Sequence, residues 1–290
     1  MLKNRIIANL ILKNNIIVQS LNFSKYLPIG SPEIAVEFLN KQGIDEIILL
    51  DIDASKEGRS FDADKLKKLS SKCLVPLTVG GGITEISQIK NLIKNGADKI
   101  SLNTSSIKNP QLIKAASEIF GSQCLVVSID VRKINGEYEV FKDSGKKSTG
   151  INPIDLAKKL EKYGAGEILI NSIDQDGMKS GYDLPLVKLI SDAVSIPVIA
   201  LGGVGHPEHF IEGIRKGNAS AVAAGNYFHF IEHSPILTKS FIKHSIDIRL
   251  NTQAKYENFN FDKTGRINKK EDEYLRKIRF EYEHEEVVWN

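Results

Sequence analysis

Short apolar runs alternate with longer amphipathic stretches along most of the chain, and each apolar run ends in Gly, Asp, Asn or Ser. Eight of the runs are nearly continuous in aliphatic and β-branched residues, which is typical of parallel strands buried on both faces. These predicted strands are residues 5–11, 46–51, 75–79, 97–102, 124–130, 167–171, 197–201 and 220–224. The pattern therefore predicts a parallel sheet whose strands alternate with covering helices.

The stretches between most of these strands have helical periodicity, as in SPEIAVEFLNKQG and NPQLIKAASEIFG. Glycine follows five of them, where the residue after a helix often needs a left-handed backbone. These glycines are Gly43, Gly96, Gly121, Gly164 and Gly217.

The chain also repeats itself at an offset of 121 residues. GIDEIILLDID returns as GAGEILINSID, and VPLTVGGGI returns as IPVIALGGV. Eight strand–helix units with a twofold repeat predict a closed (β/α)8 TIM barrel built from two half-barrels. A doubly wound open sheet is the alternative fold, but it does not explain eight strands with a twofold repeat.

Three segments depart from the barrel pattern. KNNIIVQ after the first strand and KINGEYEVFKDSG after the fifth indicate small hairpins or mobile loops at the rim. We expect the barrel to span residues 1–250 and a charged C-terminal extension to span residues 251–290, with one exposed helix over 266–282. The extension is either a solvated appendage or an element for a partner or for oligomerisation.

Composition narrows the function classes. With 41% hydrophobic residues, a formal net charge of only +3 and no basic cluster, the 290-residue chain indicates no nucleic-acid partner. Its N-terminal segment lacks the apolar core of a signal peptide, and nothing indicates a membrane span. Cys73 and Cys124 are isolated thiols, which favours a cytoplasmic protein without a metal or another cofactor.

The predicted strand ends carry glycine pairs next to polar residues. In this barrel class the chemistry lies at the C-terminal ends of the strands. Glycines let backbone N–H groups approach an anion, so each half-barrel predicts one phosphate cradle. The cradle residues are Gly81, Gly82, Asn103 and Thr104 in the first half, and Gly202, Gly203, Gly225 and Asn226 in the second, with Asp176 and Gly177 after the sixth strand. Two cradles imply a ligand with a phosphate at each end, unless the glycines only form tight turns.

Asp130 is the candidate for acid–base work, because it ends an apolar strand where burial tends to raise a carboxylate pKa. The alternative is a carboxylate that only orients a loop. Aligning the two halves puts Ile11 at the position equivalent to Asp130. The first half-barrel therefore has a hydrocarbon side chain where the second has a carboxylate.

Four charged residues lie near the beginnings of four strands, at the opposite end of the barrel. They are Arg5, Glu46, Lys99 and Glu167. Two basic and two acidic side chains on separate strands predict a ring around the barrel axis. The ring is either a gate into the interior or an ordinary salt-bridged barrel floor.

With these residues in hand, the chain resembles the HisF family, the cyclase subunit of imidazole glycerol phosphate synthase. The resemblance runs from RIIANL to about Leu250. It rests on LDIDAS, TVGGGI, GADKISLNT, FGSQ, VVSID, GEYEVF, SGKKSTG, GAGEILINSIDQDGMKSGYD and His209–Phe210, which follow in the family's order. It implies a cyclase of the lyase type that receives ammonia from a HisH-like glutaminase at the barrel bottom.

The resemblance also assigns roles to residues. Arg5, Glu46, Lys99 and Glu167 match the family's ammonia gate, and the glycine cradles match its two phosphate sites. Thr78 matches a residue of the tunnel, and Asp98 matches a residue that contacts the partner. No other cofactor is implied.

The departures from the family lie at the catalytic centre. The family has catalytic aspartates on the first and fifth strands; Asp130 matches the second, whereas Ile11 replaces the first. Gln19 replaces a Lys, Asn9 a usual Cys, and Leu201 a small hydroxyl residue. Isoleucine cannot transfer a proton, and loss of one acid–base partner typically costs about 10²–10⁴-fold in rate.

Divergent members of the family occur with enzymes of bacterial surface-polysaccharide synthesis, and there the resemblance implies delivery of ammonia to a separate sugar amidotransferase. Three hypotheses follow. The chain is an ammonia-conducting barrel outside histidine synthesis, a true cyclase that tolerates Ile11, or a non-catalytic scaffold that activates a glutaminase.

Overall fold

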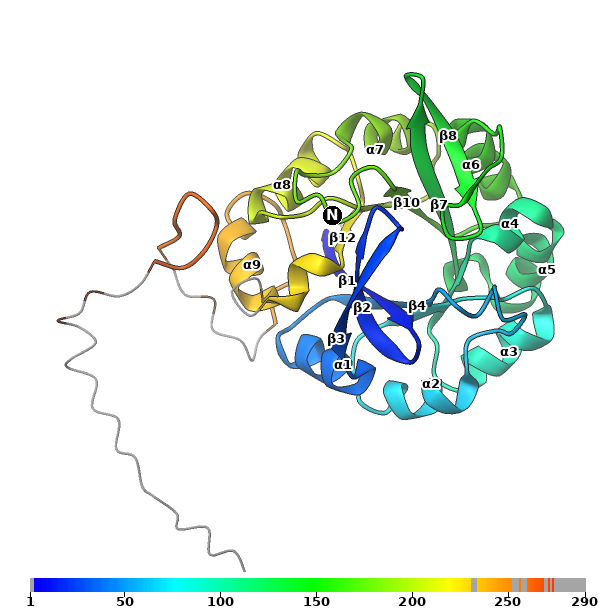
Figure 1. The fold of residues 1–290 in the computed structure, drawn as a ribbon, viewed down its shortest axis with the longest axis horizontal. Coiled ribbons are helices and arrows are strands. Elements are labelled where there is room, and N and C mark those ends of the chain that lie inside the picture. The colour runs from blue at the N-terminus through cyan, green and yellow to red at the C-terminus, as the bar shows by residue number, and fades with distance from the viewer. Residues whose placement is uncertain are drawn as a thin grey trace, which may run out of the picture.

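The computed structural model describes residues 3–230, 234–251, 256, 260–268, 271 and 273. Its eight barrel strands are β1 (Arg5–Lys13), β4 (Glu46–Asp51), β5 (Leu77–Gly80), β6 (Lys99–Leu102), β7 (Leu125–Ile134), β10 (Glu167–Ser172), β11 (Val198–Leu201) and β12 (Ala221–Ala224). Neighbouring strands are parallel, and pairing of β12 with β1 closes the sheet. The predicted (β/α)8 barrel is confirmed (Figure 1).

Helices surround the barrel (Figure 1). They are α1 (Pro32–Lys41), α2 (Ala63–Ser70), α3 (Ile86–Lys94), α4 (Thr104–Lys108), α5 (Gln111–Phe120), α6 (Pro153–Lys162), α7 (Leu184–Ser191), α8 (Pro207–Arg215) and α9 (Pro235–Ile242), with short 3₁₀ turns η1 (Ser122–Cys124) and η2 (Asn226–His229). Three of the helices begin with the same device, a capping Ser or Asn followed by Pro. The caps are Ser31, Asn152 and Ser234, whose side chains accept backbone N–H groups of the first turn.

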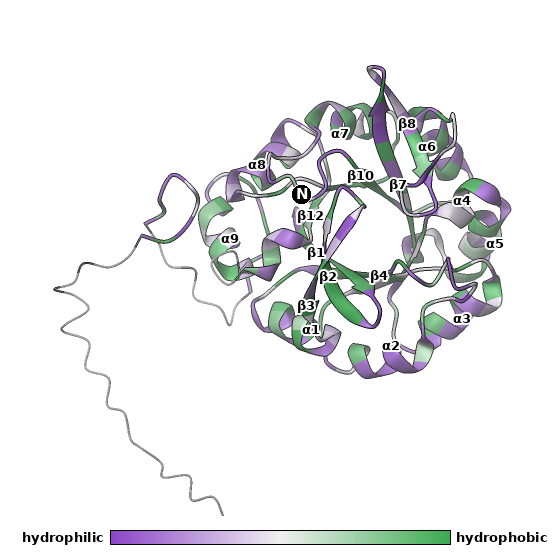
Figure 2. Cartoon of the chain, viewed as in Figure 1, coloured by the Kyte–Doolittle hydropathy of each residue, from purple (hydrophilic) through white to green (hydrophobic). Residues whose placement is uncertain are grey.

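The hydrophobic core has two layers. The larger layer lies between the sheet and the helices, which carry hydrophobic and hydrophilic positions side by side (Figure 2). The smaller layer fills the inside of the barrel and includes Ile7, Ile48, Leu169 and Ile199. Because side chains alternate along a strand, polar residues two positions from these also face the barrel interior.

Two antiparallel hairpins rise from the barrel at the C-terminal ends of β1 and β7, which confirms the predicted insertions. β2 (Ile16–Leu21) and β3 (Lys25–Gly30) extend β1, and β8 (Glu137–Lys142) and β9 (Lys147–Ser148) extend β7. Their tight turns have positive φ at both central residues, Asn14 and Asn15 in one and Asn135 and Gly136 in the other. Asn and Gly tolerate this left-handed backbone, so the local sequence fixes both turns.

The glycines that follow helices behave as predicted at four of five places. Gly43, Gly96, Gly121 and Gly164 all have positive φ. Gly217 also follows its helix, after the C-cap Lys216, but the left-handed residue there is Asn218, with φ of 56°. A Cβ at Gly217 would lie 2.9 Å from Val187 Cγ1 of α7, so this glycine serves close packing between the two helices.

The described part of the C-terminal extension packs against α8 and α9. Phe261 and Ile267 form an isolated antiparallel bridge, and the rings of Phe241 and Phe261 pack edge to face with centroids 5.1 Å apart. At Gly265 the backbone lies so close to α8 that an added Cβ would be 2.5 Å from Pro207. Most of the helix predicted over 266–282 lies outside the described residues.

Candidate functional site

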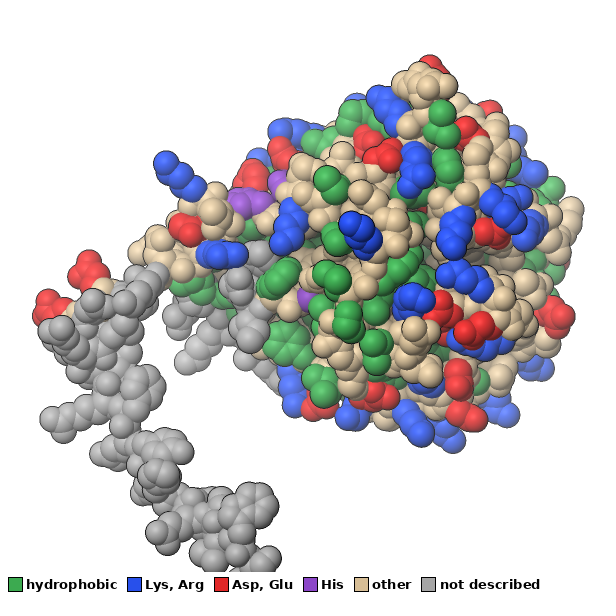
Figure 3. Space-filling model, viewed as in Figure 1, with side chains coloured by type: hydrophobic (Ala, Val, Ile, Leu, Met, Phe, Trp, Pro, Cys, Tyr) green, Lys and Arg blue, Asp and Glu red, His purple; other side chains and the backbone are tan. Residues whose placement is uncertain are grey.

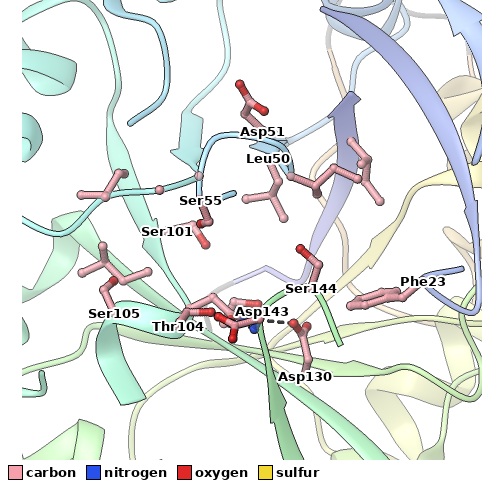
Figure 4. A pocket seen from close by; sticks show the side chains of 18 of the residues that line it. Phe23, Leu50, Asp51, Ser55, Ser101, Thr104, Ser105, Asp130, Asp143 and Ser144 are labelled. Carbon is pink, nitrogen blue, oxygen red and sulfur yellow. Dashed lines mark hydrogen bonds between the residues drawn. The ribbon is translucent and has the colours of Figure 1, made fainter. Parts of the chain in front are cut away.

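The C-terminal ends of the strands enclose a cavity of about 400 Å³. It brings together five of the predicted site residues, Gly81, Gly82, Asn103, Thr104 and Asp130. Figure 4 shows Asp130, Ser144 and Leu50 directed into the same space from different sides. In Figure 3, Lys and Arg side chains lie around this face of the molecule, interspersed with Asp and Glu.

The first glycine pair is required by the backbone itself. Gly81 and Gly82 have φ of 129° and 63°, and a Cβ on Gly82 would lie 1.8 Å from the Arg59 carbonyl oxygen. Thr104 begins α4 beside them, and its hydroxyl accepts the backbone N–H of Asp143 at 3.1 Å. The result is an open polar recess on one side of the mouth.

The second cradle repeats this backbone geometry in a smaller cavity of about 30 Å³. Gly202 and Gly203 also have positive φ, at 99° and 101°. Asn103 and Gly225, which precede the short helices of the two cradles, share an unusual conformation, with φ/ψ of −119°/−95° and −103°/−86°. The internal repeat therefore extends from sequence to backbone conformation.

The β2–β3 hairpin is hydrogen-bonded to two residues of the second cradle. Asp176 accepts the Ser20 hydroxyl at 2.6 Å and the Phe23 backbone N–H at 3.2 Å. Asn226 accepts the Ser20 N–H and donates to the Ser20 carbonyl. A Cβ on Gly177 would lie 2.4 Å from Leu21 of the hairpin. The side chains of Asp176 and Asn226 thus hold the hairpin in place.

Asp130 lies at the bottom of the mouth cavity with 6% of its surface exposed. Asn103 Nδ2 donates to one carboxylate oxygen at 2.9 Å, and Asn171 Nδ2 lies 3.4 Å from the other. Burial raises the pKa of Asp130 to about 7, although the two amides lower it, and the Asp176 carboxylate adds to the rise. A carboxyl group with this pKa can exchange a proton near neutral pH.

Ile11 occupies the position on β1 that Asp130 occupies on β7. Ile11 is paired in register with Leu50, and Asp130 is paired with Asn171. Leu50 and Asn171 are equivalent at the 121-residue offset, so the sheet register confirms the equivalence drawn from the sequence. Ile11 lines both cavities and places a hydrocarbon side chain between them.

Two asparagines on β1 and β10 were not predicted as site residues. Asn9 and Asn171 line both cavities, and each has a buried Oδ1 without a hydrogen-bond partner among the described residues. The only signal for Asn171 was its place at a strand end. Leu201 lines the smaller cavity, whereas Gln19 lies on β2 in register with Leu27.

At the opposite end of the barrel, the four predicted charged residues form a closed ring. Arg5 Nη1 lies 2.7 Å from Glu46 Oε1 and 2.8 Å from Glu167 Oε1. Lys99 Nζ lies 3.2 Å from Glu46 Oε2 and 3.0 Å from Glu167 Oε2. Positive and negative side chains alternate around the ring, and each charge has two partners of opposite sign.

The remaining predicted residues lie next to the ring. Thr78 is 1% exposed and is paired in register with Lys99, and its neighbours Leu77 and Val79 belong to the outer core layer. The Thr78 side chain therefore faces the barrel interior. Asp98 precedes β6 on the outside, where it is exposed and accepts the Leu77 backbone N–H at 2.8 Å.

Within the described residues, no three His, Cys, Asp or Glu side chains group as a metal site. No described helix is long and apolar enough to cross a membrane.

The fold and the site define a (β/α)8 barrel with two glycine-rich recesses at its mouth and a ring of ion pairs at its base. The histidine biosynthesis protein family matches residues 5–234. A protein of Vibrio vulnificus (strain YJ016), provisionally named imidazole glycerol phosphate synthase subunit hisF2, is 45% identical over 267 residues, 92% of this chain and 98% of its own length. Imidazole glycerol phosphate synthase subunit HisF of Clostridium botulinum, strains Langeland and Okra, is 47% identical over 245 residues, 84% of this chain and 97% of each relative. The chain belongs to the HisF family of imidazole glycerol phosphate synthase subunits.

The Vibrio and Clostridium relatives match different lengths of this chain. The Clostridium match covers 245 residues, about the length of the barrel. The Vibrio match covers 267 residues, which is more than the 250 that precede the extension. At least part of the extension is therefore included in the match to the Vibrio relative.

Proposed function

We propose that this chain is the ammonia-conducting barrel of a glutamine-dependent amidotransferase that works outside histidine synthesis. In this proposal a HisH-like glutaminase docks on the barrel bottom beside Asp98. Ammonia passes the ring and Thr78 and reaches the phosphate-binding mouth. There it is used on a phosphorylated ligand or delivered to a separate sugar amidotransferase of surface-polysaccharide synthesis.

The observation that carries the proposal is a contrast between the two ends of the barrel. The base keeps a complete ring of four ion pairs, whereas the mouth has Ile11 in register with Asp130. A ring of buried charges is expensive to desolvate, and hydrocarbon packing would serve stability at least as well. Its presence supports a role in passage, while Ile11 removes one proton-transfer group.

In this proposal, the other polar residues of the mouth have separate roles. Asp130, with its raised pKa of about 7, can take a proton from a nitrogen nucleophile near neutral pH. The open cradle at Gly82 and Thr104 offers backbone N–H groups and a hydroxyl to a phosphate. Asp176 carries a carboxylate, so we assign it to holding the hairpin and not to contacting the anion.

The alternative is a true cyclase that forms imidazole glycerol phosphate and aminoimidazole carboxamide ribotide. Its support is the 47% identity to HisF of Clostridium botulinum, together with Asp130 and two repeated cradles. A scaffold that only activates a glutaminase has the weakest support, because it needs neither the cradles nor a buried carboxyl group at the mouth.

The test supplies the purified chain with the ribulosyl bisphosphate intermediate and free ammonium, so that no glutaminase is needed. We expect cyclisation far below the roughly 10 s⁻¹ that is ordinary for enzymes. Turnover near that value would overturn the proposal in favour of the cyclase. A relative with aspartates at both positions serves as the positive control for substrate quality.

A further inference from the structure

Two buried amide oxygens at the upper end of the barrel interior have no hydrogen-bond partner among the described residues. They are Oδ1 of Asn9 and Oδ1 of Asn171, on side chains that are only 4% and 7% exposed. Buried polar atoms are nearly always paired, so each exception calls for an explanation such as a ligand. Both side chains line the mouth cavity and also the smaller cavity beside it.

The orientation of Asn171 is fixed by its neighbour. Its Nδ2 faces Asp130, a carboxylate that accepts hydrogen bonds, so Oδ1 must face the other way. There it meets Gly202, where an added Cβ would lie 3.0 Å from it. Because Gly202 has no side chain, the oxygen opens into the smaller cavity, whose volume of about 30 Å³ holds only one or two water-sized molecules.

Asn9 lies on β1 on the other side of the same space. Gly225 is beside it, and a Cβ at Gly225 would lie 2.9 Å from the Asn9 carbonyl oxygen. Below the two asparagines, the apolar layer that includes Ile7 and Ile199 separates them from the charged ring. A small molecule rising from the ring would therefore leave an apolar segment and meet two acceptor oxygens.

We propose that Asn9 and Asn171 form a holding site for ammonia or ammonium at the top of the barrel interior. Two carboxamide oxygens accept two N–H groups, and the small cavity that both side chains line leaves the remaining N–H groups to ordered water. Ammonia and ammonium each have several N–H donors and are about as small as water. They therefore fit a small cavity whose polar atoms are hydrogen-bond acceptors. This assignment rests on the proposed function, because it places the site at the end of an ammonia path.

The test uses the thallous ion, which resembles ammonium in size and charge and is located by anomalous scattering. Crystals of the full chain are soaked in thallous acetate at pH 8, where Asp130 is mostly ionised. We expect an anomalous peak in contact with both Oδ1 atoms, and we expect added ammonium chloride to displace it. Ordered water alone at both oxygens in the wild-type protein would overturn the assignment.

Variants separate the two oxygens from the rest of the mouth. Asn9→Leu keeps the size of the side chain and removes one oxygen that would contact the ion, and it should weaken thallous binding roughly two- to tenfold, an effect of the same order as the loss of one polar contact. Asn91→Leu, at an exposed position on α3, is the matched control and should leave the binding unchanged. An unchanged affinity in Asn9→Leu would also overturn the assignment.

Thallous binding is measured without a glutaminase. A failure of the holding site can therefore be distinguished from a failure of the proposed function. Thallous binding at the two oxygens with no coupling to a glutaminase would refute the ammonia path and keep the cation site. Coupling to a glutaminase without binding at the two oxygens would keep the path and refute the holding site.

Discussion

Ile11 on β1 and Asp130 on β7 occupy the same register position in the two halves of the barrel. One carries a buried carboxyl group with a pKa raised to about 7, and the other carries only hydrocarbon. The backbones of the two halves are equivalent at this pair. The side chains are not, because one is apolar and the other is a carboxylic acid. Of this pair, only Asp130 has a side chain that can transfer a proton.

An aspartate at position 11 tests whether a second acid–base group raises the rate of cyclisation. We expect Ile11→Asp to raise the residual rate of cyclisation with free ammonium by about 10² or more, in line with the usual contribution of a positioned acid or base. Single-turnover measurements on the ribulosyl bisphosphate should show the gain. Ile11→Asn, which restores polarity without a titrating group, is the control and should show little gain. Equal rates in both variants would argue against acid–base loss as the cause.

The raised pKa of Asp130 makes stability depend on pH. Because the folded-state pKa is about 7 and the ordinary value is 3.8, the protonated form is favoured by folding. That contribution is complete below about pH 4 and is lost as the pH rises through about 7. Asp130→Asn removes this dependence. We expect the variant to gain about 1–3 kcal/mol relative to wild type between pH 5 and pH 8.

Urea unfolding at the two pH values measures this difference. Asp155→Asn, at an exposed position on α6, corrects for general effects of pH. A constant difference between Asp130→Asn and wild type would show that Asp130 is ionised throughout the range.

The two cradles should bind phosphate unequally. The first lies in the cavity of about 400 Å³, whereas the second lies in the cavity of about 30 Å³ and is hydrogen-bonded to the hairpin through Asp176 and Asn226. We expect phosphate to bind at Gly82 and Thr104 with higher affinity than at Gly203. Ser20→Ala removes the 2.6 Å hydrogen bond to Asp176 and should strengthen binding at the second cradle.

Crystals soaked in phosphate and calorimetric titration test this order. Ser24→Ala alters another hairpin hydroxyl that bonds only to the Leu21 carbonyl, so it is the matched control. An empty first cradle at high phosphate would contradict the proposed phosphate site.

One buried ion pair, between α9 and the residue before β4, should contribute strongly to stability. Lys239 on α9 is 1% exposed and donates to Asp45, to the Gly43 carbonyl and to the Arg249 carbonyl, all within 2.8 Å. Lys239→Met leaves the Asp45 carboxylate buried without its cation and should cost about 3–5 kcal/mol. Denaturant unfolding measures the loss.

The double variant Lys239→Met with Asp45→Leu should recover part of that loss, because it removes the unpaired charge as well. Lys188→Met breaks an exposed pair on α7 and should change stability little. A similar small effect for Lys239→Met would mean that water replaces the lysine.

Much of this structure follows from local sequence. The Asn14–Asn15 and Asn135–Gly136 turns are encoded by residues that tolerate positive φ, and strand ends of a barrel necessarily meet at one mouth. The charged ring was predictable for the same reason, since strand beginnings meet at the other end.

The contacts that distinguish the two cradles were not predictable. They join Ser20 to Asp176 and Asn226 over 156 and 206 residues, and no local pattern specifies which side chain the hairpin will meet. The unpaired oxygens of Asn9 and Asn171 depend likewise on what each amide fails to contact. At Gly217 the glycine follows α8 as expected, but the left-handed residue is Asn218, and an added Cβ at Gly217 would lie 2.9 Å from Val187 of α7.

The charged ring gives the most direct test of the central claim that ammonia travels through this barrel. The chain is combined with its glutaminase and the acceptor enzyme, with amide-¹⁵N-labelled glutamine and an excess of unlabelled ammonium. Lys99 bridges Glu46 and Glu167, so Lys99→Ala should open the ring, whereas Lys94→Ala at the end of α3 should leave it intact. The account predicts a product rich in ¹⁵N for wild type and Lys94→Ala, and a ¹⁵N fraction close to that of the bulk ammonium for Lys99→Ala. A wild-type product with the bulk ¹⁵N fraction would contradict passage through the barrel.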